Sequence, residues 1–331
     1  MFKLKTILFC LPIYLLLLLL VPGVAYAAEF GLSIDPPVTT IKALAPAVAT
    51  SPFTIKNNGE AQVTLKIQIK PFKPAGENGD LEYFKEIPDF FKDIKILDGN
   101  SPTESLTLSP KQQKTLELSV DIPQGTTTSD HYFSVIFIST DTSPIKSNSS
   151  INQIGIASNV LLSVGIPETP NSTLEEFSSR LIFDKGPVPF TVRIKNQGAH
   201  LIQPRGQIII KNMFGQIVGS LDLAPVNILS DSIRAIPNDA YLQELSAQKN
   251  PDVGFKLLDS RRPIAIWKEN FLLGLYTATL NIAISDQGPI FKKDIHFFAF
   301  PLRGAIIILI AVILIIITGK RLKFYANKNR T

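Results

Sequence analysis

The side chains that most often carry enzyme chemistry are few in this chain and widely spaced. The three histidines are His131, His200 and His296, and none lies at metal-ligand spacing from another histidine or a cysteine. The stretch ENGDLEY, residues 77–83, lacks the alternating acids and closing glutamate of a calcium loop, so it predicts a polar hairpin tip. The sequence contains no G-x-S-x-G, Walker or H-E-x-x-H motif. These patterns predict a protein that is not an enzyme and that holds neither a metal nor a cofactor.

One segment offers residue types that are favoured at binding interfaces, and it runs over residues 236–270. A loop of this length in a compact domain usually has a function or is disordered. We expect a partly helical insertion on the surface, with Tyr241, Arg261, Arg262 and Trp267 as candidate partner-binding residues. The alternative is that Trp267, the only tryptophan, packs back on its own domain.

Two matching phrases indicate how the rest of the chain is arranged. FTIKNNGEAQVTLKI covers residues 53–67, and FTVRIKNQGAHLIQPRGQIII covers residues 190–210. In each phrase an alternating apolar stretch is followed by Ile-Lys-Asn, one polar residue and Gly. Ile55 and Ile194 are the matched isoleucines, and their separation of about one domain length predicts two tandem copies of one architecture. We expect the Asn and Gly of both triplets to turn one strand into the next through left-handed backbone conformations.

Short alternating stretches with turn residues between them predict that both copies are all-β. HYFSVIFIST, residues 131–140, is apolar on both faces, as in the middle of a sheet or at a covered edge. GQIIIKNMFGQIVGSLDL, residues 206–223, reads as a hairpin that turns at residues 212–215. The predicted fold is two tandem immunoglobulin-like antiparallel β-sandwich domains, over residues 28–167 and 168–302. The second domain carries the insertion 236–270.

The two ends of the chain read as targeting and anchoring segments. Residues 1–27 have a basic start, an apolar run and an A-x-A site, which predicts a signal peptide cut after Ala27. An uncleaved anchor helix is the alternative. Residues 303–319 are almost wholly aliphatic, and this predicts one transmembrane helix. The basic tail, residues 320–331, then lies in the cytoplasm by the positive-inside rule.

The charge of the chain follows from this layout. The formal net charge is +5, yet all 28 acidic residues lie between the signal peptide and the aliphatic run, where they outnumber the basic ones. The basic excess is therefore a mark of topology, and it predicts no nucleic-acid partner. The single cysteine lies in the signal peptide, so we expect a domain pair without disulfides, which is typical of bacterial surface proteins.

The sequence resembles the WxL-interacting protein family of Gram-positive bacteria. The similar stretches are FGLSIDPPVTTIKALAPAVATSPFTIKNNG (30–59), GENGDLEYF (76–84) and LTLSPKQQKTLELSVDIP (106–123). The resemblance implies a membrane-anchored surface protein with a signal peptide, two tandem sandwich domains and a C-terminal transmembrane helix. It also implies a first domain that binds peptidoglycan and a second that binds a WxL-type surface protein or host matrix.

The sequence thus predicts a non-enzymatic, membrane-anchored bacterial cell-surface protein that binds wall polymer, another surface protein, or both, as an adhesion or scaffold component. Its location would be the plasma membrane, with the sandwich domains outside the cell. One alternative is a sensor or assembly subunit of a membrane complex. Another alternative is a lectin-like protein that binds carbohydrate.

Overall fold

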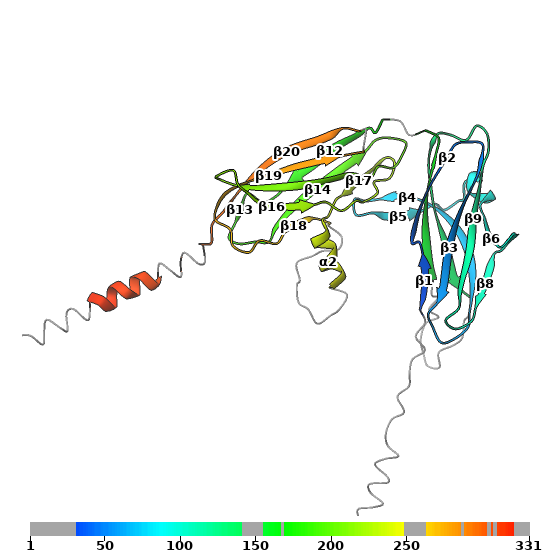
Figure 1. Cartoon of the computed structure of the whole chain (residues 1–331), viewed down its shortest axis with the longest axis horizontal. Helices are drawn as coiled ribbons and strands as arrows, with labels where there is room; N and C mark the ends of the chain where they lie inside the picture. The colour runs from blue at the N-terminus through cyan, green and yellow to red at the C-terminus, as the bar shows by residue number, and fades with distance from the viewer. Residues whose placement is uncertain are drawn as a thin grey trace, which may run out of the picture.

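The computed structural model describes residues 31–140, 155–166, 169–247, 263–285, 288–302, 306 and 310–320, with the backbone alone described for 244–247. Within these residues strands dominate. They form two sandwiches, one over each half of the predicted repeat, each with its own hydrophobic core (Figure 1). The all-β class expected from the sequence is confirmed.

The first sandwich packs two sheets, with strand orders β1-β3-β9-β6-β7 and β2-β11-β10-β4-β5, and β8 also pairs with β4. Its strands are β1 (Leu32–Asp35), β2 (Val38–Ala43), β3 (Ala47–Asn57), β4 (Val63–Ala75), β5 (Asp80–Tyr83), β6 (Lys95–Asp98), β7 (Ser101–Pro102), β8 (Ser105–Leu108), β9 (Gln113–Ile122), β10 (Ser129–Ser139) and β11 (Gly155–Val164). A 3-10 turn, η1 (Asp89–Asp93), buries Phe91. Most pairs are antiparallel, whereas β2 runs parallel to β11.

The second sandwich has a sheet of order β12-β14-β17, in which β18 also pairs with β14, and a larger sheet of order β13-β20-β19-β15-β16. Its elements are β12 (Ser172–Ser178), β13 (Ile182–Phe183), β14 (Val188–Asn196), β15 (Arg205–Asn212), β16 (Ile217–Asp222), β17 (Ser232–Ala235), α2 (Asp239–Ala247), β18 (Ala265–Trp267), β19 (Gly274–Ala283) and β20 (Ile290–Ala299). The hairpin expected at 206–223 is confirmed as β15 and β16.

The period-2 pattern of the sequence explains which side chains form the cores. Along β14 every second residue is buried, and Val188, Phe190, Val192 and Ile194 are each 0% exposed. The strand β10 lies between β11 and β4, as its two apolar faces predicted. The side chains of Phe133, Val135 and Phe137, on one face of the strand, belong to the hydrophobic core of the first sandwich. The other face is covered at one end only, where Tyr132 is buried.

The Ile-Lys-Asn part of the repeated phrase ends in a buried asparagine in each sandwich. Asn57, the last residue of β3, is 3% exposed, and its Nδ2 donates to the carbonyls of Ala61, Leu108 and Ser109 at 2.7, 3.3 and 3.1 Å. Its Oδ1 accepts from the backbone N–H of Gly59 at 2.9 Å. The amide therefore joins the end of one strand to two loops and leaves none of its groups unsatisfied.

Asn196, the last residue of β14, repeats this arrangement. It is 0% exposed, and its Nδ2 donates to the carbonyls of His200, Ile228 and Leu229 at 2.8, 3.1 and 3.1 Å. Its Oδ1 accepts from the N–H of Gly198 at 3.0 Å. The expected equivalence of the two turns is confirmed, but the expected reason for it is wrong. The described residues with positive φ do not include those of either triplet. Side-chain hydrogen bonding, not backbone handedness, forms these turns.

The two sandwiches meet at an interface that we call the joint. The first sandwich contributes the β4–β5 hairpin, Asp130, Tyr132 and Ser163 to it. The second sandwich contributes residues 193–201 and 228–235. The hairpin tip predicted from ENGDLEY contacts the second sandwich, where Glu77 accepts two bonds from Arg193 Nη1, at 2.9 and 2.7 Å. The Glu77 carbonyl also accepts from the N–H of Ala235 at 2.9 Å. Hydrogen bonding with Glu77 raises the pKa of Arg193.

A small apolar cluster seals the centre of the joint. Phe72, Tyr132 and Leu161 of the first sandwich pack with Leu229 of the second. The hydroxyl of Tyr132 donates to Asp130 Oδ2 at 2.7 Å and accepts from the N–H of Ser230 at 3.0 Å. Burial raises the pKa of this phenol. Apolar burial and paired polar groups together hold the two sandwiches in one arrangement.

The structure covers the two end segments only in part. The expected signal peptide, residues 1–27, lies outside the described residues, as do most of the tail 320–331 and part of the expected transmembrane segment 303–319. Residues 310–320 are helical and are drawn in red in Figure 1. In the part of the chain that the structure describes, no helix combines the length and apolarity needed to cross a membrane.

The buried asparagines yield a first prediction. Replacing Asn57 or Asn196 by Ala leaves buried backbone groups without partners, so each change should lower the free energy of unfolding by about 1–3 kcal/mol. Chemical denaturation measures this loss. Asn58→Ala and Gln197→Ala are the matched controls, since both residues are the exposed neighbours of the buried ones. A loss no larger than that of the controls would contradict the structural role of the two amides.

A second prediction concerns the joint. Asp130→Ala removes the acceptor that Tyr132 and the N–H of Leu201 share. The two sandwiches should then melt in separate calorimetric steps, whereas in the parent protein they should melt together. Circular dichroism should show both sandwiches still folded. Asp121→Ala, at an exposed position of β9, should leave the calorimetric trace unchanged. A single unchanged transition in the Asp130 variant would show that this carboxylate does not couple the sandwiches.

Candidate binding surface

The aromatic candidates from the sequence are placed in the interior of the second sandwich. Trp267 ends β18 and is 7% exposed, and Tyr241 in α2 is 1% exposed. The indole packs edge-on against Tyr276 and Phe297, with ring centroids 5.7 and 6.5 Å apart. The alternative interpretation, in which Trp267 packs on its own domain, is the one the structure supports. These two rings offer little surface to a partner.

The segment 236–270 is built into the domain at both of its described ends. At one end it is helical, as expected, and forms α2. At the other it forms β18, where Val188 pairs with Trp267. Asn238 connects the two, because its Nδ2 donates to the Ile266 carbonyl and its Oδ1 accepts from the Ile266 N–H, both at 3.0 Å. Arg261 and Arg262 lie outside the described residues. A partner-binding role for the segment stays a prediction.

Three residue types of a serine hydrolase come together in the joint, a cluster that the sequence did not indicate. Asp130 Oδ1 and Ser163 Oγ both lie 2.8 Å from Nδ1 of His200. In a catalytic triad the serine and the carboxylate bond to opposite ring nitrogens. Here Nε2 is buried without a hydrogen-bond partner, and the Asp130 side chain is 0% exposed. The geometry therefore does not activate Ser163 as a nucleophile, and the cluster fixes the joint.

The rings of the other two histidines have other neighbours, although His131 directly follows Asp130 in β10. His131 stacks on Phe90 with ring centroids 4.1 Å apart, and burial lowers its pKa. His296 lies on the outer face of the second sandwich, where its Nδ1 is 3.0 Å from the hydroxyl of Thr277. The structure thus places each histidine at a separate site.

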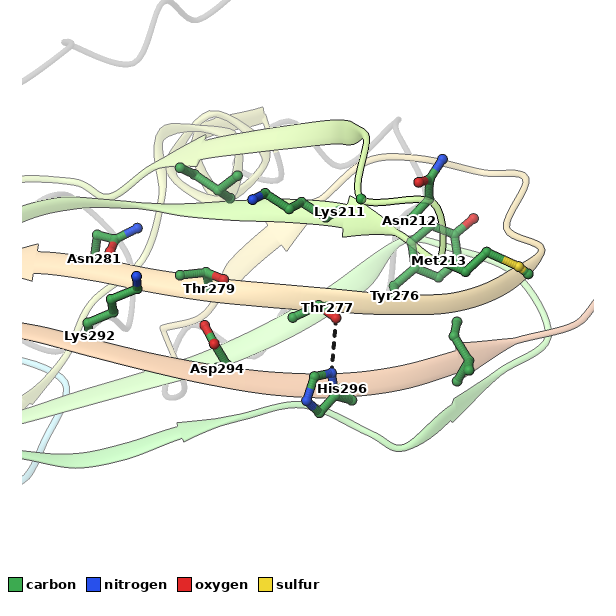
Figure 2. Close-up of a pocket in the computed structure, with 13 residues that line it drawn as sticks. Lys211, Asn212, Met213, Tyr276, Thr277, Thr279, Asn281, Lys292, Asp294 and His296 are labelled. Carbon is green, nitrogen blue, oxygen red and sulfur yellow. Dashed lines mark hydrogen bonds between the residues drawn. The ribbon is translucent and has the colours of Figure 1, made fainter.

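The outer face of the sheet β13-β20-β19-β15-β16 carries an open hollow with a volume of about 690 Å³ (Figure 2). Strand pairing lines up its side chains in three rows across β15, β19 and β20. The rows are Lys211–Thr277–His296, Ile209–Thr279–Asp294 and Asn281–Lys292, the last of which has no lining residue from β15. Because side chains alternate along a strand, the residues between these rows point inward, and Ile208, Ile210, Ala278 and Leu280 are fully buried.

The hollow combines ammonium, carboxylate, hydroxyl, amide and imidazole groups on a rigid sheet. Lys211, Lys292 and Asp294 are exposed and supply both signs of charge. Such a surface is suited to hydrogen-bonding and ion-pairing with a polar ligand. It has no cysteine and no pair of facing carboxylates to divide acid and base roles. The sequence analysis did not single out these positions, since any solvent-facing strand shows the same alternation.

No family model matches this chain, and the search of curated proteins finds no match. A chain from the structure reported as a chaperone–tip adhesin complex in CFA/I fimbriae biogenesis is 16% identical, with a TM-score of 0.39 and coverage of 81% of this chain and 98% of that one. The class 5 fimbriae chaperone CfaA is 13% identical, with a TM-score of 0.39 and coverage of 80% and 98%.

A third structure with a similar arrangement is the CsuC–CsuE chaperone–tip adhesion subunit pre-assembly complex of Csu pili from Acinetobacter baumannii. Its matching chain is 11% identical, with a TM-score of 0.33 and coverage of 62% of this chain and 89% of that one. We assign no function from these likenesses.

The burial of Trp267 yields a third prediction. As the only tryptophan, it reports on its own surroundings. Its emission should be blue-shifted in the native protein and should shift to the red on unfolding, and acrylamide should quench it only weakly before unfolding. Free tryptophan amide in the same buffer is the reference for a solvated indole. Native emission and quenching equal to that reference would show an exposed ring and restore Trp267 as a binding candidate.

Proposed function

We propose that this chain is a non-enzymatic bacterial cell-surface protein that is anchored in the plasma membrane and holds wall polymer in the hollow of its second sandwich. The observation that carries the proposal is the hollow itself, with three rows of side chains across β15, β19 and β20 that are all polar except Ile209. The anchoring part rests on the sequence, with a signal peptide over residues 1–27 and a transmembrane helix over 303–319.

The chemistry of the hollow fits a wall polymer because such a polymer presents several kinds of polar group along one chain. Sugar hydroxyls and acetamido groups match the hydroxyls and amide of Thr277, Thr279 and Asn281. Peptide stems carry free carboxylates and amines, which match Lys292 and Asp294. The hollow is open and its lining extends along the strands, so a chain-like ligand that runs parallel to them can lie over all three rows. Tyr276, the tyrosine in the lining of the hollow, is only 8% exposed, so it offers little of the stacking surface that a lectin prefers.

A second candidate partner is another surface protein, and one observation favours it. β16 is the edge strand of the same sheet, and its Ile217 and Val218 are 64% and 40% exposed. An edge with exposed apolar side chains can accept an added strand from a partner. This mode would use backbone hydrogen bonds at the edge and would not need the polar rows.

Binding to isolated wall sacculi tests the proposal with the full chain in detergent. The double variant Lys211→Ala, Asp294→Ala removes one charge of each sign from the hollow. It should weaken retention on sacculi about tenfold, equivalent to about 1.4 kcal/mol of binding free energy. The matched control is Lys42→Ala, Asp121→Ala, at exposed positions of the first sandwich, and it should bind as the parent does.

The competing outcomes are distinct. Unchanged retention of the Lys211, Asp294 variant on sacculi would refute the hollow as the wall-binding site. Val218→Lys places a charge on the edge strand and leaves the hollow intact. If this variant loses a co-purifying exported protein while the hollow variant keeps it, the edge strand is the binding site.

A further inference from the structure

The end of the second sandwich opposite the joint is unusually apolar. This end contains the β15–β16 turn, the segment before β19 and the last residues of β20, from which the chain continues to the C-terminal helix (Figure 1). We call its exposed apolar side chains the collar. The collar consists of Met213, Phe214, Phe271, Leu273, Leu275 and Phe298, which are 57%, 80%, 67%, 54%, 56% and 39% exposed.

Strand pairing brings the collar residues to one place although they come from three parts of the sequence. Leu275 and Phe298 are cross-strand partners, and Gly274 pairs with Ala299 beside them. The turn of β15 and β16 lies over the same point, since a side chain added at Gly274 would stand 3.3 Å from Cε of Met213. The collar is therefore one continuous edge of the domain.

The concentration of aromatic side chains distinguishes the collar from the rest of the described surface. Among the described residues the exposed phenylalanines are Phe84, Phe214, Phe271 and Phe298, and the last three belong to the collar. Fully burying one such side chain is favourable by roughly 1.5–3 kcal/mol of transfer free energy relative to leaving it in water. A clustered exposed apolar surface of this kind usually marks an interaction site.

The position of the collar along the chain indicates what covers it. Gly304, where the uncharged aliphatic run begins, lies only five positions after Ala299, the end of β20. A fully extended chain of that length spans at most about 17 Å. The headgroup region on each side of the hydrocarbon core is roughly 5–8 Å thick. If the aliphatic run spans the membrane, the collar end of the domain lies within reach of the lipid surface.

We propose that the collar inserts into the headgroup region of the outer leaflet and seats the second sandwich on the membrane that anchors it. This inference rests on the membrane anchoring in the proposed function. Phenylalanine, leucine and methionine side chains at the boundary of headgroups and acyl chains gain apolar contact without entering the core of the bilayer. Seating at the collar fixes the height of the domain. Because Met213 and Leu275 also line the hollow, the hollow then opens next to the membrane surface.

Depth-dependent quenching tests this proposal on the full chain. With Cys10→Ser as background, single cysteines at Phe214→Cys and Phe271→Cys carry an environment-sensitive fluorophore. The protein is placed in phosphatidylcholine and phosphatidylglycerol vesicles with a nitroxide on the lipid near the headgroup. Ile290→Cys is the matched control, since Ile290 is 73% exposed and begins β20, the strand that ends at the collar. A ten-residue strand places it about 30 Å from that end.

We expect severalfold stronger quenching and a blue-shifted emission at positions 214 and 271 than at position 290. Two labelled sites guard against a variant that fails to fold. Equal, weak quenching at all three sites, in protein that stays with the vesicles after an alkaline wash, overturns the collar while the anchor stands. Release of the protein by the alkaline wash overturns anchoring, and the collar proposal with it. Oxidative disulfide cross-linking of two copies of the unlabelled Phe214→Cys variant, with no quenching in the labelled protein, would assign the collar to a second copy of this chain.

Discussion

The hydrogen bonds of one buried carboxamide control the end of the second sandwich that meets the first. Asn196 closes β14 and holds the carbonyls of His200, Ile228 and Leu229 with a single amide nitrogen. Those carbonyls belong to the two loops that supply His200, Leu229 and Ser230 to the joint. A buried amide is costly unless all its hydrogen bonds are made, so the loops have one low-energy arrangement. The position of one sandwich relative to the other follows from that arrangement.

The joint supplies hydrogen-bond partners for the Asp130 carboxylate that the first sandwich alone does not provide. The Asp130 side chain is fully buried. Among the groups that hydrogen-bond to its carboxylate, only Tyr132 comes from the same sandwich. The ring of His200 and the N–H of Leu201 come from the second. Because a buried carboxylate with missing partners is expensive, separating the sandwiches costs more than the loss of apolar contact alone. In the first copy of the repeat, Asn57 performs the same local task as Asn196, although its loops contact no second domain.

This rigid arrangement separates the surfaces of the second sandwich by role. One end is occupied by the joint, and the opposite end presents apolar side chains beside the exit of the chain toward the aliphatic segment. The polar hollow lies on the sheet face between them. A sheet can display such different surfaces because alternate side chains of the same strands fill the core, which leaves the outward positions free to vary in chemistry. Binding at the hollow would therefore not disturb the core or the joint, whereas the hollow shares Met213 and Leu275 with the membrane end.

The sequence by itself determined the all-β class, the tandem repeat and the hairpin of β15 and β16, because these depend on period-2 alternation and on turn residues close in sequence. It also singled out the triplets that follow Ile55 and Ile194, but it could not reveal that their asparagine side chains, rather than left-handed backbones, form the turns. Only the tertiary structure decided that Trp267 belongs to the core and that Asp130 meets His200. Each of these contacts joins residues from separate strands or loops, and their spacing in the sequence carries no signal. The polar hollow went unnoticed for a related reason: outward polar residues are expected on any solvated strand, and only the register of three strands shows which of them stand side by side.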